Sequence, residues 1–317
     1  MNNKTIETLG EFGLIDEIKK WVPPLTLTLI PQGRGKGEGI VGIGDDAAVF
    51  RSSGKMNQLL TIDTLVENVD FVRNQTTPQK IGWKALGINL SDIAAMGGIP
   101  KVAVVSLILP RRTELNFVKG FYEGIRKLAQ KFGVLIVGGD LSKGSVISCA
   151  IAMVGEADPK FTVYRSGAKI GDFICVTGRL GGSILGKHLD FMPRIKEGLF
   201  LAKHGVSAMI DISDGLCQDL KHITNESKVG GMIDERKIPI AKAALKLAKG
   251  NRKNALEHAL SDGEDFELLF TVAENCLYPL EKIWRKWFKT ELTQIGKIVA
   301  RDNATLEMRK RLGFQHF

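Results

Sequence analysis

Apolar residues recur at helical spacing between about residues 78 and 96. Ile81, Ala85 and Ile88 follow one another by three or four positions, which is the period of a helix with one buried face. Two glycines and a proline come next and predict where this helix ends. Asp92 lies on it among alanines and isoleucines, where an ionised carboxylate is costly unless a partner satisfies it. Asp92 is therefore either a hydrogen-bonded core or capping residue, or a functional acid.

The remaining hydrophobic runs predict an alternation of strands and helices. Strands are predicted at about residues 47–50, 58–65, 101–109, 134–137, 145–154, 172–176, 208–212, 230–233, 266–272 and 292–298. Further helices are predicted at about residues 3–21, 113–132, 215–227, 241–248, 253–260 and 279–289. This order predicts an α/β or α+β fold with mixed sheets. A polar stretch near residues 158–169 predicts a boundary, so we expect two domains, 1–157 and 158–317.

Composition narrows the class of protein without giving an activity. The 317 residues are 44% hydrophobic and 25% charged, as in an ordinary soluble protein of about two domains. The four cysteines are widely spaced without a CxxC pair, and the first residues lack a signal-peptide pattern. We therefore expect reduced thiols and a cytoplasmic location. No apolar run is long enough to span a membrane, so we expect no membrane partner.

The net charge of +9 permits an anionic partner. Many of the bases cluster near the C-terminus, and such a run is more typical of a solvated helix face than of a nucleic-acid site. No aromatic residues interleave with these bases in an RNA-binding pattern, so we expect no nucleic-acid partner. Anionic small molecules suit the charge equally well. A glycine-rich loop at residues 33–39 lacks the following G-K-[ST] of a phosphate-binding loop.

Acidic residues recur beside glycines at the predicted ends of apolar elements. The places are Asp45-Asp46, Asp63, Asp92, Asp140, and Asp211 with Asp214. Ligands collect at strand ends in such folds, and glycine lets a ligand approach the backbone. Each acid alone is more typical of a turn or helix cap, and Asp214 in particular is placed to cap a helix. Together, however, these acids are too many for coincidence.

Converging carboxylates limit the chemistry. The chain has no HxH, HExxH or cysteine pair, so ligands for a soft metal are missing. Carboxylate oxygens favour Mg²⁺, which commonly bridges acids to substrate phosphates. A pair of acids acting as general acid and base is the alternative, but it needs only two acids and leaves the glycines unexplained. A further acid, Glu264, precedes an alternating strand and reads either as a solvated turn or as part of the site.

Seven motifs in order resemble the thiamine-monophosphate kinase family, a branch of the aminoimidazole-ribonucleotide synthetase-like superfamily. They are G-I-G-D-D-A-A, T-I-D-T-L-V, N-L-S-D-I-A-A-M-G-G-I-P, V-G-G-D, Y-R-S-G-A-K-I-G-D, I-D-I-S-D-G-L and G-E-D-F-E-L-L-F. The resemblance implies ATP-dependent phosphorylation of thiamine monophosphate to thiamine diphosphate by direct in-line transfer. It implies several Mg²⁺ ions, ATP as co-substrate and a homodimer paired through the N-terminal domain. That domain would bind metal and ATP, and the C-terminal domain would complete the nucleotide and substrate site.

The resemblance also implies roles for individual residues, with no catalytic acid or base. Magnesium ligands would be Asp46, Thr61, Asp63, Asp92, Asp140, Asp211 and Asp214. Contacts to ATP would come from Tyr122, Gly139, Asp140, Arg165 and Ser213. Contacts to thiamine monophosphate would come from Asp70, Glu264 and Phe314.

This sequence departs from the family at two positions. Asp70 stands where the family usually has histidine, and Ile62 replaces a hydroxyl residue before Asp63. Selenophosphate synthetase, a relative, needs a reactive cysteine near its N-terminus, whereas the first cysteine here is Cys149. The hydrogenase-maturation relative ends in a cysteine, whereas this chain ends in His316-Phe317. Aminoimidazole-ribonucleotide synthetase remains open, as does a non-catalytic module that binds phosphate or nucleic acid.

Overall fold

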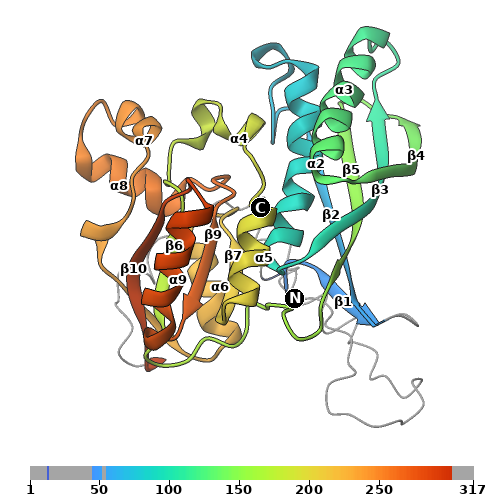
Figure 1. The fold of residues 1–317 in the computed structure, drawn as a ribbon. Coiled ribbons are helices and arrows are strands. Elements are labelled where there is room, and N and C mark those ends of the chain that lie inside the picture. Colours follow the sequence, from blue (N-terminus) through green and yellow to red (C-terminus); the bar gives the residue numbers. More distant parts are fainter. Residues whose placement is uncertain (1–12, 14–44, 52–54, 302–317) are drawn as a thin grey trace, which may run out of the picture.

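The computed structural model describes residues 13, 45–51 and 55–301. The helix predicted at residues 3–21, the glycine-rich loop at 33–39 and Phe314 lie outside the described residues. The described chain forms two five-stranded sheets, one on each side of a long helix, α2 (Pro78–Ala95) (Figure 1).

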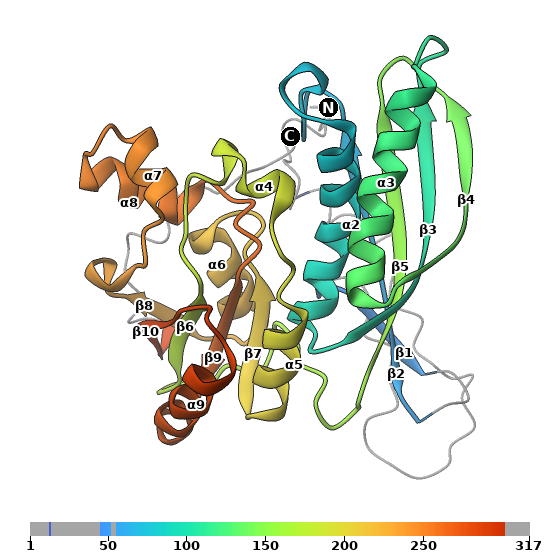
Figure 2. The same cartoon turned by 45° about the horizontal axis from the view of Figure 1, so that its top comes forward.

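The first sheet is mixed and is covered by helices on one face. Its strands, in spatial order, are β1 (Ala48–Arg51), β2 (Asn57–Val66), β5 (Ser148–Ala157), β3 (Ile99–Leu109) and β4 (Leu135–Lys143). Only the pair β3/β4 is parallel. A helix, α3 (Leu115–Phe132), connects these two strands as a parallel pair requires. Helices α2 and α3 lie side by side on the same face of the sheet (Figure 2).

Two glycines allow these helices to approach each other closely. A Cβ atom added at Gly82 would lie 1.9 Å from the main-chain oxygen of Phe121. A Cβ atom added at Gly124 would lie 1.9 Å from the main-chain oxygen of Gln79. Both distances are far below any real contact, so a larger residue at either position would push the helices apart. This packing fixes α2, the helix that carries Asp92.

The second sheet pairs its strands antiparallel throughout the described residues. Its strands, in spatial order, are β7 (Val206–Asp211), β9 (Leu268–Val272), β6 (Phe173–Thr177), β10 (Leu292–Val299) and β8 (Gly230–Ile233). We call the first sheet with α2 and α3 the first half of the molecule, and the second sheet with its helices the second half. The α-helices of the second half are α4 (Lys187–Asp190), α5 (Ile195–Lys203), α6 (Leu216–Glu226), α7 (Lys242–Leu247), α8 (Arg252–Ser261) and α9 (Glu274–Trp287). Short 3-10 turns are η1 (Arg73–Gln75), η2 (Ser183–Leu185) and η3 (Glu235–Lys237).

The two sheets differ in how their faces are covered. All five residues of β9 are buried: Phe270 packs into the core shared with the first half, and Leu269 packs into the core beside α6. Strand β5 instead alternates between buried and half-buried residues along its whole length. Such alternation is typical of a sheet with one face in the core. On the other face of the first sheet, Ile62 is 66% exposed, and no described helix covers it.

The predicted α/β class is confirmed, and each strand predicted from residue 47 onward is present within a few residues. Two details were wrong. Asp140 lies inside strand β4 rather than at its end, because β4 continues to Lys143, past the predicted end at about residue 137. Asp63 also lies inside its strand, β2, which agrees with the range predicted for that strand but not with a position at its end. The last helix begins at Glu274, and Pro279 lies within it. Among the described residues, no helix is long and apolar enough to cross a membrane.

Candidate active site

Helix α2 brings acids of the two halves together. Ser91 on α2 donates a hydrogen bond of 2.5 Å to Oδ2 of Asp211, the last residue of β7. One position further along α2, Asp92 offers a carboxylate oxygen that lies within 4.8 Å of oxygens from Asp46 and Asp211. We call Asp46, Asp92 and Asp211 the carboxylate basin. Its members come from segments far apart in the sequence, so the basin exists only because α2 packs against both halves (Figure 1).

Strand β2 adds two further predicted residues beside the basin. Thr61 and Asp63 are two positions apart on β2, so they point to the same, helix-covered face. The hydroxyl of Thr61 donates a short hydrogen bond to Oδ2 of Asp92. Burial raises the pKa of Asp63 to about 6, with Asp46 and Asp70 adding to the rise and a hydrogen bond with Asp92 opposing it.

Arg165 supplies positive charge to the basin from the chain between the two sheets. Its Nη2 donates to Oδ1 of Asp46 at 2.9 Å, and its main-chain N–H donates to the carboxylate of Asp45. Burial lowers the pKa of Arg165, but Asp46, Asp45 and Asp92 together outweigh it, so the pKa is raised and the group stays cationic. Burial first and Asp46 second raise the pKa of Asp45 to about 7.

One arginine does not balance the acids that face it. The pKa values of Asp92 and Asp211 lie well above the ordinary value, first because of burial and then because of neighbouring carboxylates. In addition, Oδ2 of Asp46 is buried and has no hydrogen-bond partner among the described residues. Buried anions without partners are strongly unfavourable. The basin is therefore built to receive a cation that the described part of the protein does not supply.

A second group of possible metal ligands follows β7. Ligand atoms of Asp214, Asp219 and His222 lie within 4.8 Å of one another. Asp214 does not cap α6 as predicted. Instead Gly215 is the N-cap residue before the helix begins at Leu216, and Asp219 accepts hydrogen bonds from the main-chain N–H groups of Asp214 and Gly215. Ser213, in the same turn, accepts a main-chain hydrogen bond from Glu264.

Asp140 and Gly139 lie away from the basin within one chain. Asp140 on β4 is paired with Ser106 on β3, which is paired through β5 with Thr64 on β2. Asp140 and Thr64 are thus separated by three strand spacings, a distance of about 14 Å across the sheet. The side chain of Asp140 points to the uncovered face of the sheet, opposite to that of Asp63. Gly139 has a packing role, because a Cβ atom there would lie 2.0 Å from the main-chain oxygen of Val105.

Tyr122 lines a cavity that has none of the predicted acids in its lining. This half-buried residue of α3 lines the cavity, of about 360 Å³, with Ile125, Ala129 and Leu135 at the start of β4. The lining is mostly apolar, with Arg126 and Gln130 as its polar members, so the cavity offers mainly hydrophobic contact.

Of the three predicted substrate residues, Phe314 lies outside the described residues and Glu264 is not among the residues that line the cavity between the two halves. Asp70 does line this cavity, which is larger than the one at Tyr122. This cavity, of about 550 Å³, has Asp70, Val69 and Val72 on one side and Leu185 and His188 on the other. Asp70 accepts a hydrogen bond of 2.6 Å from the main-chain N–H of Val66. The cavity has apolar side chains in its lining and lies between the two halves, and both features suit an organic substrate.

Lys84 of α2 joins the substrate side of the site to the second half. Its Nζ donates to a carboxylate oxygen of Glu264 and to the main-chain oxygen of Asp70. Glu264 lies directly before Asp265, whose carboxylate accepts from the main-chain N–H of Gly181 at 2.7 Å. The loop that precedes β9 is therefore tied to both halves.

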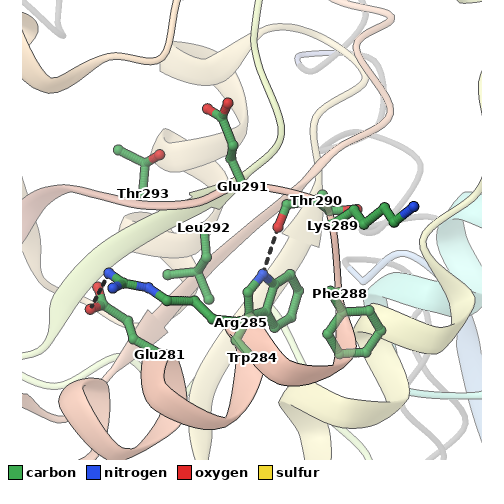
Figure 3. A pocket seen from close by; sticks show the side chains of 9 residues that line it. All are labelled: Glu281, Trp284, Arg285, Phe288, Lys289, Thr290, Glu291, Leu292 and Thr293. Atoms are coloured by element: carbon green, nitrogen blue, oxygen red, sulfur yellow. Dashed lines mark hydrogen bonds and ion pairs between the residues drawn. The ribbon is translucent and has the colours of Figure 1, made fainter.

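A third cavity, of about 310 Å³, lies at the end of α9 (Figure 3). Trp284 donates from Nε1 to the main-chain oxygen of Thr290 at 2.7 Å, and Arg285 lies 3.7 Å from a carboxylate oxygen of Glu281. None of the predicted site residues that the structure describes lines this cavity. Two pairs of its polar groups satisfy each other, and Glu291 forms an ion pair with Arg179 outside the lining.

Several site residues were not predicted as functional: Ser91, Lys84, Asp219 and His222. Ser91 stood in a recognised motif, and its position one residue before Asp92 gave a usable signal. Lys84 gave a weaker signal, since a lysine among apolar residues of a buried helix needs a partner. Asp219 and His222 lie four and seven positions into the segment after Gly215, and their approach to Asp214 depends on the turn that the structure reveals.

Comparisons with known proteins agree with this arrangement. Family models described as AIR synthase related protein, N-terminal domain and C-terminal domain, match residues 44–157 and 134–309. The thiamine-monophosphate kinase of Rhodopirellula baltica is 40% identical over 270 residues, 82% of this chain and 84% of that protein. The thiamine-monophosphate kinase of Aquifex aeolicus is 34% identical over 334 residues, 98% of this chain and 99% of that protein.

A solved structure described as AaThiL complexed with AMPPCP and TMP is also similar over the whole length. It superposes with a TM-score of 0.83 at 31% identity, and the match covers 100% of both chains. The order of the acidic motifs, the two-sheet fold and the sequence relatives all lead to the same assignment. The chain belongs to the AIR synthase related proteins and, among them, to the thiamine-monophosphate kinase family.

Proposed function

We propose that this chain transfers the γ-phosphoryl group of ATP to the phosphate of thiamine monophosphate, which yields thiamine diphosphate and ADP. The observation that carries the proposal is the convergence of Asp46, Asp92 and Asp211 between the two halves. ATP and a phosphate monoester repel each other and repel carboxylates, so a site that joins them needs extra positive charge. A kinase that works through divalent cations meets this need, and the family relationship supports it.

The basin fits Mg²⁺ on chemical grounds. Its donors are hard carboxylate oxygens close to one another, and the buried Oδ2 of Asp46 lacks a partner among the described residues. We propose that several ions are held by Asp46, Thr61, Asp63, Asp92, Asp140, Asp211 and Asp214. When bound, Mg²⁺ neutralises phosphate charge and aligns the two substrates. The residues of the chain hold that arrangement rigid, since Ser91 and Thr61 orient the carboxylates of Asp211 and Asp92.

The nucleotide contacts are supported by one arginine and one cavity. Arg165 has a buried Nε atom without a partner among the described residues, so its planar fork retains a donor for phosphate. Ser213 lies beside Asp214 and can donate its hydroxyl. We assign Tyr122 and Gly139, with Asp140, to the remaining ATP contacts, the apolar cavity at Tyr122 being suited to a flat ring.

Thiamine monophosphate is assigned to the cavity between the halves, with Asp70, Glu264 and Phe314 as its contacts. The acceptor oxygen belongs to a phosphate that is already ionised at neutral pH. No general base is therefore required, and the chain contributes positioning and charge rather than a catalytic acid or base. Direct in-line transfer needs no covalent intermediate on the protein.

We propose that two copies pair through the uncovered face of the first sheet. Leu60, Ile62 and Val104 on this face are each more than a third exposed, and an apolar sheet face of this kind is a site of association. Asp140 points to the same face, so its contacts to metal and ATP are assigned to the assembled dimer. A sedimentation measurement gives the number of copies. We further propose a domain boundary after residue 157 and a cytoplasmic location, in keeping with the four free cysteines.

A product assay tests the proposed reaction. Full-length protein is incubated with ATP, Mg²⁺ and thiamine monophosphate, and the products are separated by chromatography. Thiamine diphosphate and ADP are expected in equal amounts. Free thiamine and an aminoimidazole precursor serve as competing acceptors and are expected to give no phosphorylated product. The proposal fails if thiamine monophosphate is recovered unchanged, or if another acceptor is preferred.

A further inference from the structure

A fully buried lysine lies between the two halves and has no part in the carboxylate basin. The side chain of Lys84 has 0% exposure. Its Nζ donates to Oε1 of Glu264 and, at 2.8 Å, to the main-chain oxygen of Asp70. A buried ammonium is costly unless acceptors surround it. These two acceptors come from different halves of the molecule, and both residues belong to the proposed substrate side of the site.

Glu264 is held in one conformation by its surroundings. Its φ angle of 52° is unusual for a residue with a side chain, and Gly263 before it has a φ of 74°. The main-chain N–H of Glu264 donates to Ser213, and its main-chain oxygen accepts from the hydroxyl of Ser183, each at 2.7 Å. The backbone of Glu264 is thus fixed before any ligand binds, and only the direction of its carboxylate remains to be set.

Lys84 sets that direction. It binds Oε1 of Glu264, while Oε2 has no donor among the described residues and the side chain is 32% exposed. One carboxylate oxygen is therefore occupied from inside the protein, and the other is presented outward. Because Lys84 itself is fully buried, it reaches a ligand only through Glu264.

The second acceptor of Lys84 belongs to the wall of the 550 Å³ cavity. Asp70 lines this cavity, and Lys84 holds its main chain while the N–H of Val66 holds its carboxylate. His188 lines the opposite wall, and its pKa is lowered mainly by burial, with Lys84 lowering it further and Glu264 raising it. The ammonium of Lys84 and the carboxylate of Glu264 are thus close enough to the cavity walls at Asp70 and His188 to influence both.

We propose that Lys84 is a positioning residue for the phosphate acceptor. Lys84 holds the wall at Asp70 and the carboxylate of Glu264 in fixed relation, so that Oε2 of Glu264 meets an N–H donor on the acceptor's ring. This inference rests on the proposed kinase function and deepens it. A purely structural ion pair between the halves is the alternative, and it predicts a change in stability without a change in acceptor binding.

The test compares Lys84→Met with a matched lysine-to-methionine control, Lys127→Met, at an exposed position of α3. Methionine fills the buried space, and Glu264 is exposed enough to be hydrated once its partner is gone, so we expect the variant to fold. For Lys84→Met the KM for thiamine monophosphate should rise about tenfold or more, while the KM for ATP stays within about twofold. Lys127→Met should leave both values unchanged.

A double-mutant cycle shows whether Lys84 acts through Glu264. Lys84→Met should raise the acceptor KM much less in a Glu264→Gln background than in the wild-type background, because the carboxylate is already lost. Titration calorimetry with thiamine monophosphate, without ATP, provides a binding readout that does not depend on turnover. If Lys84→Met does not fold, Lys84→Arg keeps the charge but moves its donors, and the same cycle and titration are run on it.

Three outcomes overturn the inference: an unchanged acceptor KM, equal rises in the KM for both substrates, or additive effects of Lys84→Met and Glu264→Gln. Failure of the proposed function has a different signature. In that case the wild-type protein makes no thiamine diphosphate and binds no thiamine monophosphate, whatever residue stands at position 84.

Discussion

Two regions of this molecule bury carboxylates, and they treat them differently. Glu267, directly before β9, is 1% exposed. Arg194 donates to both of its oxygens at 2.7 Å, Lys187 donates at 2.9 Å and the hydroxyl of Thr177 at 2.8 Å. Burial alone raises the pKa of Glu267, but Lys187 and Arg194 outweigh it and the pKa is lowered. This acid is ionised and satisfied by the protein itself.

The carboxylate basin has no comparable set of partners. Asp211 is 3% exposed, and Arg165 donates to Asp46 rather than to Asp211 or Asp92. Burial and neighbouring acids raise the pKa values of Asp92 and Asp211 well above the ordinary value. At Glu267 the protein itself provides the cations that balance a buried acid. In the basin the described residues leave the acids short of positive charge, and the expected source of that charge is bound Mg²⁺.

The largest expected effect is on turnover in the basin. Asp92→Asn keeps the shape of the side chain but removes the charge that would bind Mg²⁺, so kcat should fall by about 10³-fold or more. The folded protein without metal should be at least as stable as wild type, because repulsion among the acids is relieved. Steady-state kinetics and thermal unfolding without Mg²⁺ measure the two quantities.

Asp158→Asn, at an exposed position, is the matched control and should leave kcat unchanged. A variant Asp92→Asn that turns over at nearly the wild-type rate would show that Asp92 binds no essential metal. A large loss of stability instead would show that Asp92, like Glu267, stabilises the folded protein.

The next effect is on stability, in the second region. Glu267→Gln removes the charge that Lys187 and Arg194 surround, and breaking a buried ion pair in this way costs about 3–5 kcal/mol. The KM for both substrates should remain near wild type, because Glu267 faces no cavity described above. Chemical denaturation measures the free energy of unfolding. If Glu267→Gln lost activity without losing stability, Glu267 would have a functional role rather than the structural one assigned to it.

The smallest expected effect is the pH dependence of stabilisation by Mg²⁺. The folded pKa values of Asp63 and Asp45, about 6 and about 7, exceed the ordinary value of 3.8. Metal-free folded protein therefore binds protons more tightly than unfolded protein, and the contribution of these acids to stability is lost as pH rises through about 4 to 7. Mg²⁺ competes with those protons, so it should raise Tm little near pH 5 and more near pH 8.

Thermal unfolding with and without Mg²⁺ across this pH range is the measurement. Glu267 changes the stability of the protein with pH in the opposite direction. Because its pKa is lowered in the folded state, its contribution to stability is present above its unfolded pKa and is lost as the pH falls. An increase in Tm with Mg²⁺ that is the same at all pH values would mean that the metal binds outside the basin.

Much of the fold could be predicted from hydrophobic periodicity. The alternation in β5 and the continuous apolar run of β9 identify strands with one or two buried faces. Periodicity could not show that β4 continues through Gly138-Gly139, because glycine there reads as a strand end, whereas Gly139 allows the strand to approach Val105 closely. Asp140 was therefore expected at a strand end and lies mid-strand on the uncovered face.

Only the part of the candidate site that leaves a local signal in the sequence could be predicted. Asp46, Asp92 and Asp211 were found because acids beside glycines in apolar runs are unusual, and their meeting is a consequence of α2 packing against both halves. The partners that hold them, such as Ser91, and the pairing of Lys84 with Glu264 depend on distances between residues up to 180 positions apart in the sequence. No local pattern records such distances.

The most direct test of the central claim is anomalous scattering from crystals of the full chain grown with Mn²⁺ and a non-hydrolysable ATP analogue. Mn²⁺ takes the same hard oxygen ligands as Mg²⁺ and can be located by its own signal. We predict anomalous peaks among the carboxylates of Asp46, Asp92 and Asp211, and none at Glu267. Mn²⁺ bound only elsewhere, with these three carboxylates contacting one another directly around no ion, would contradict the account.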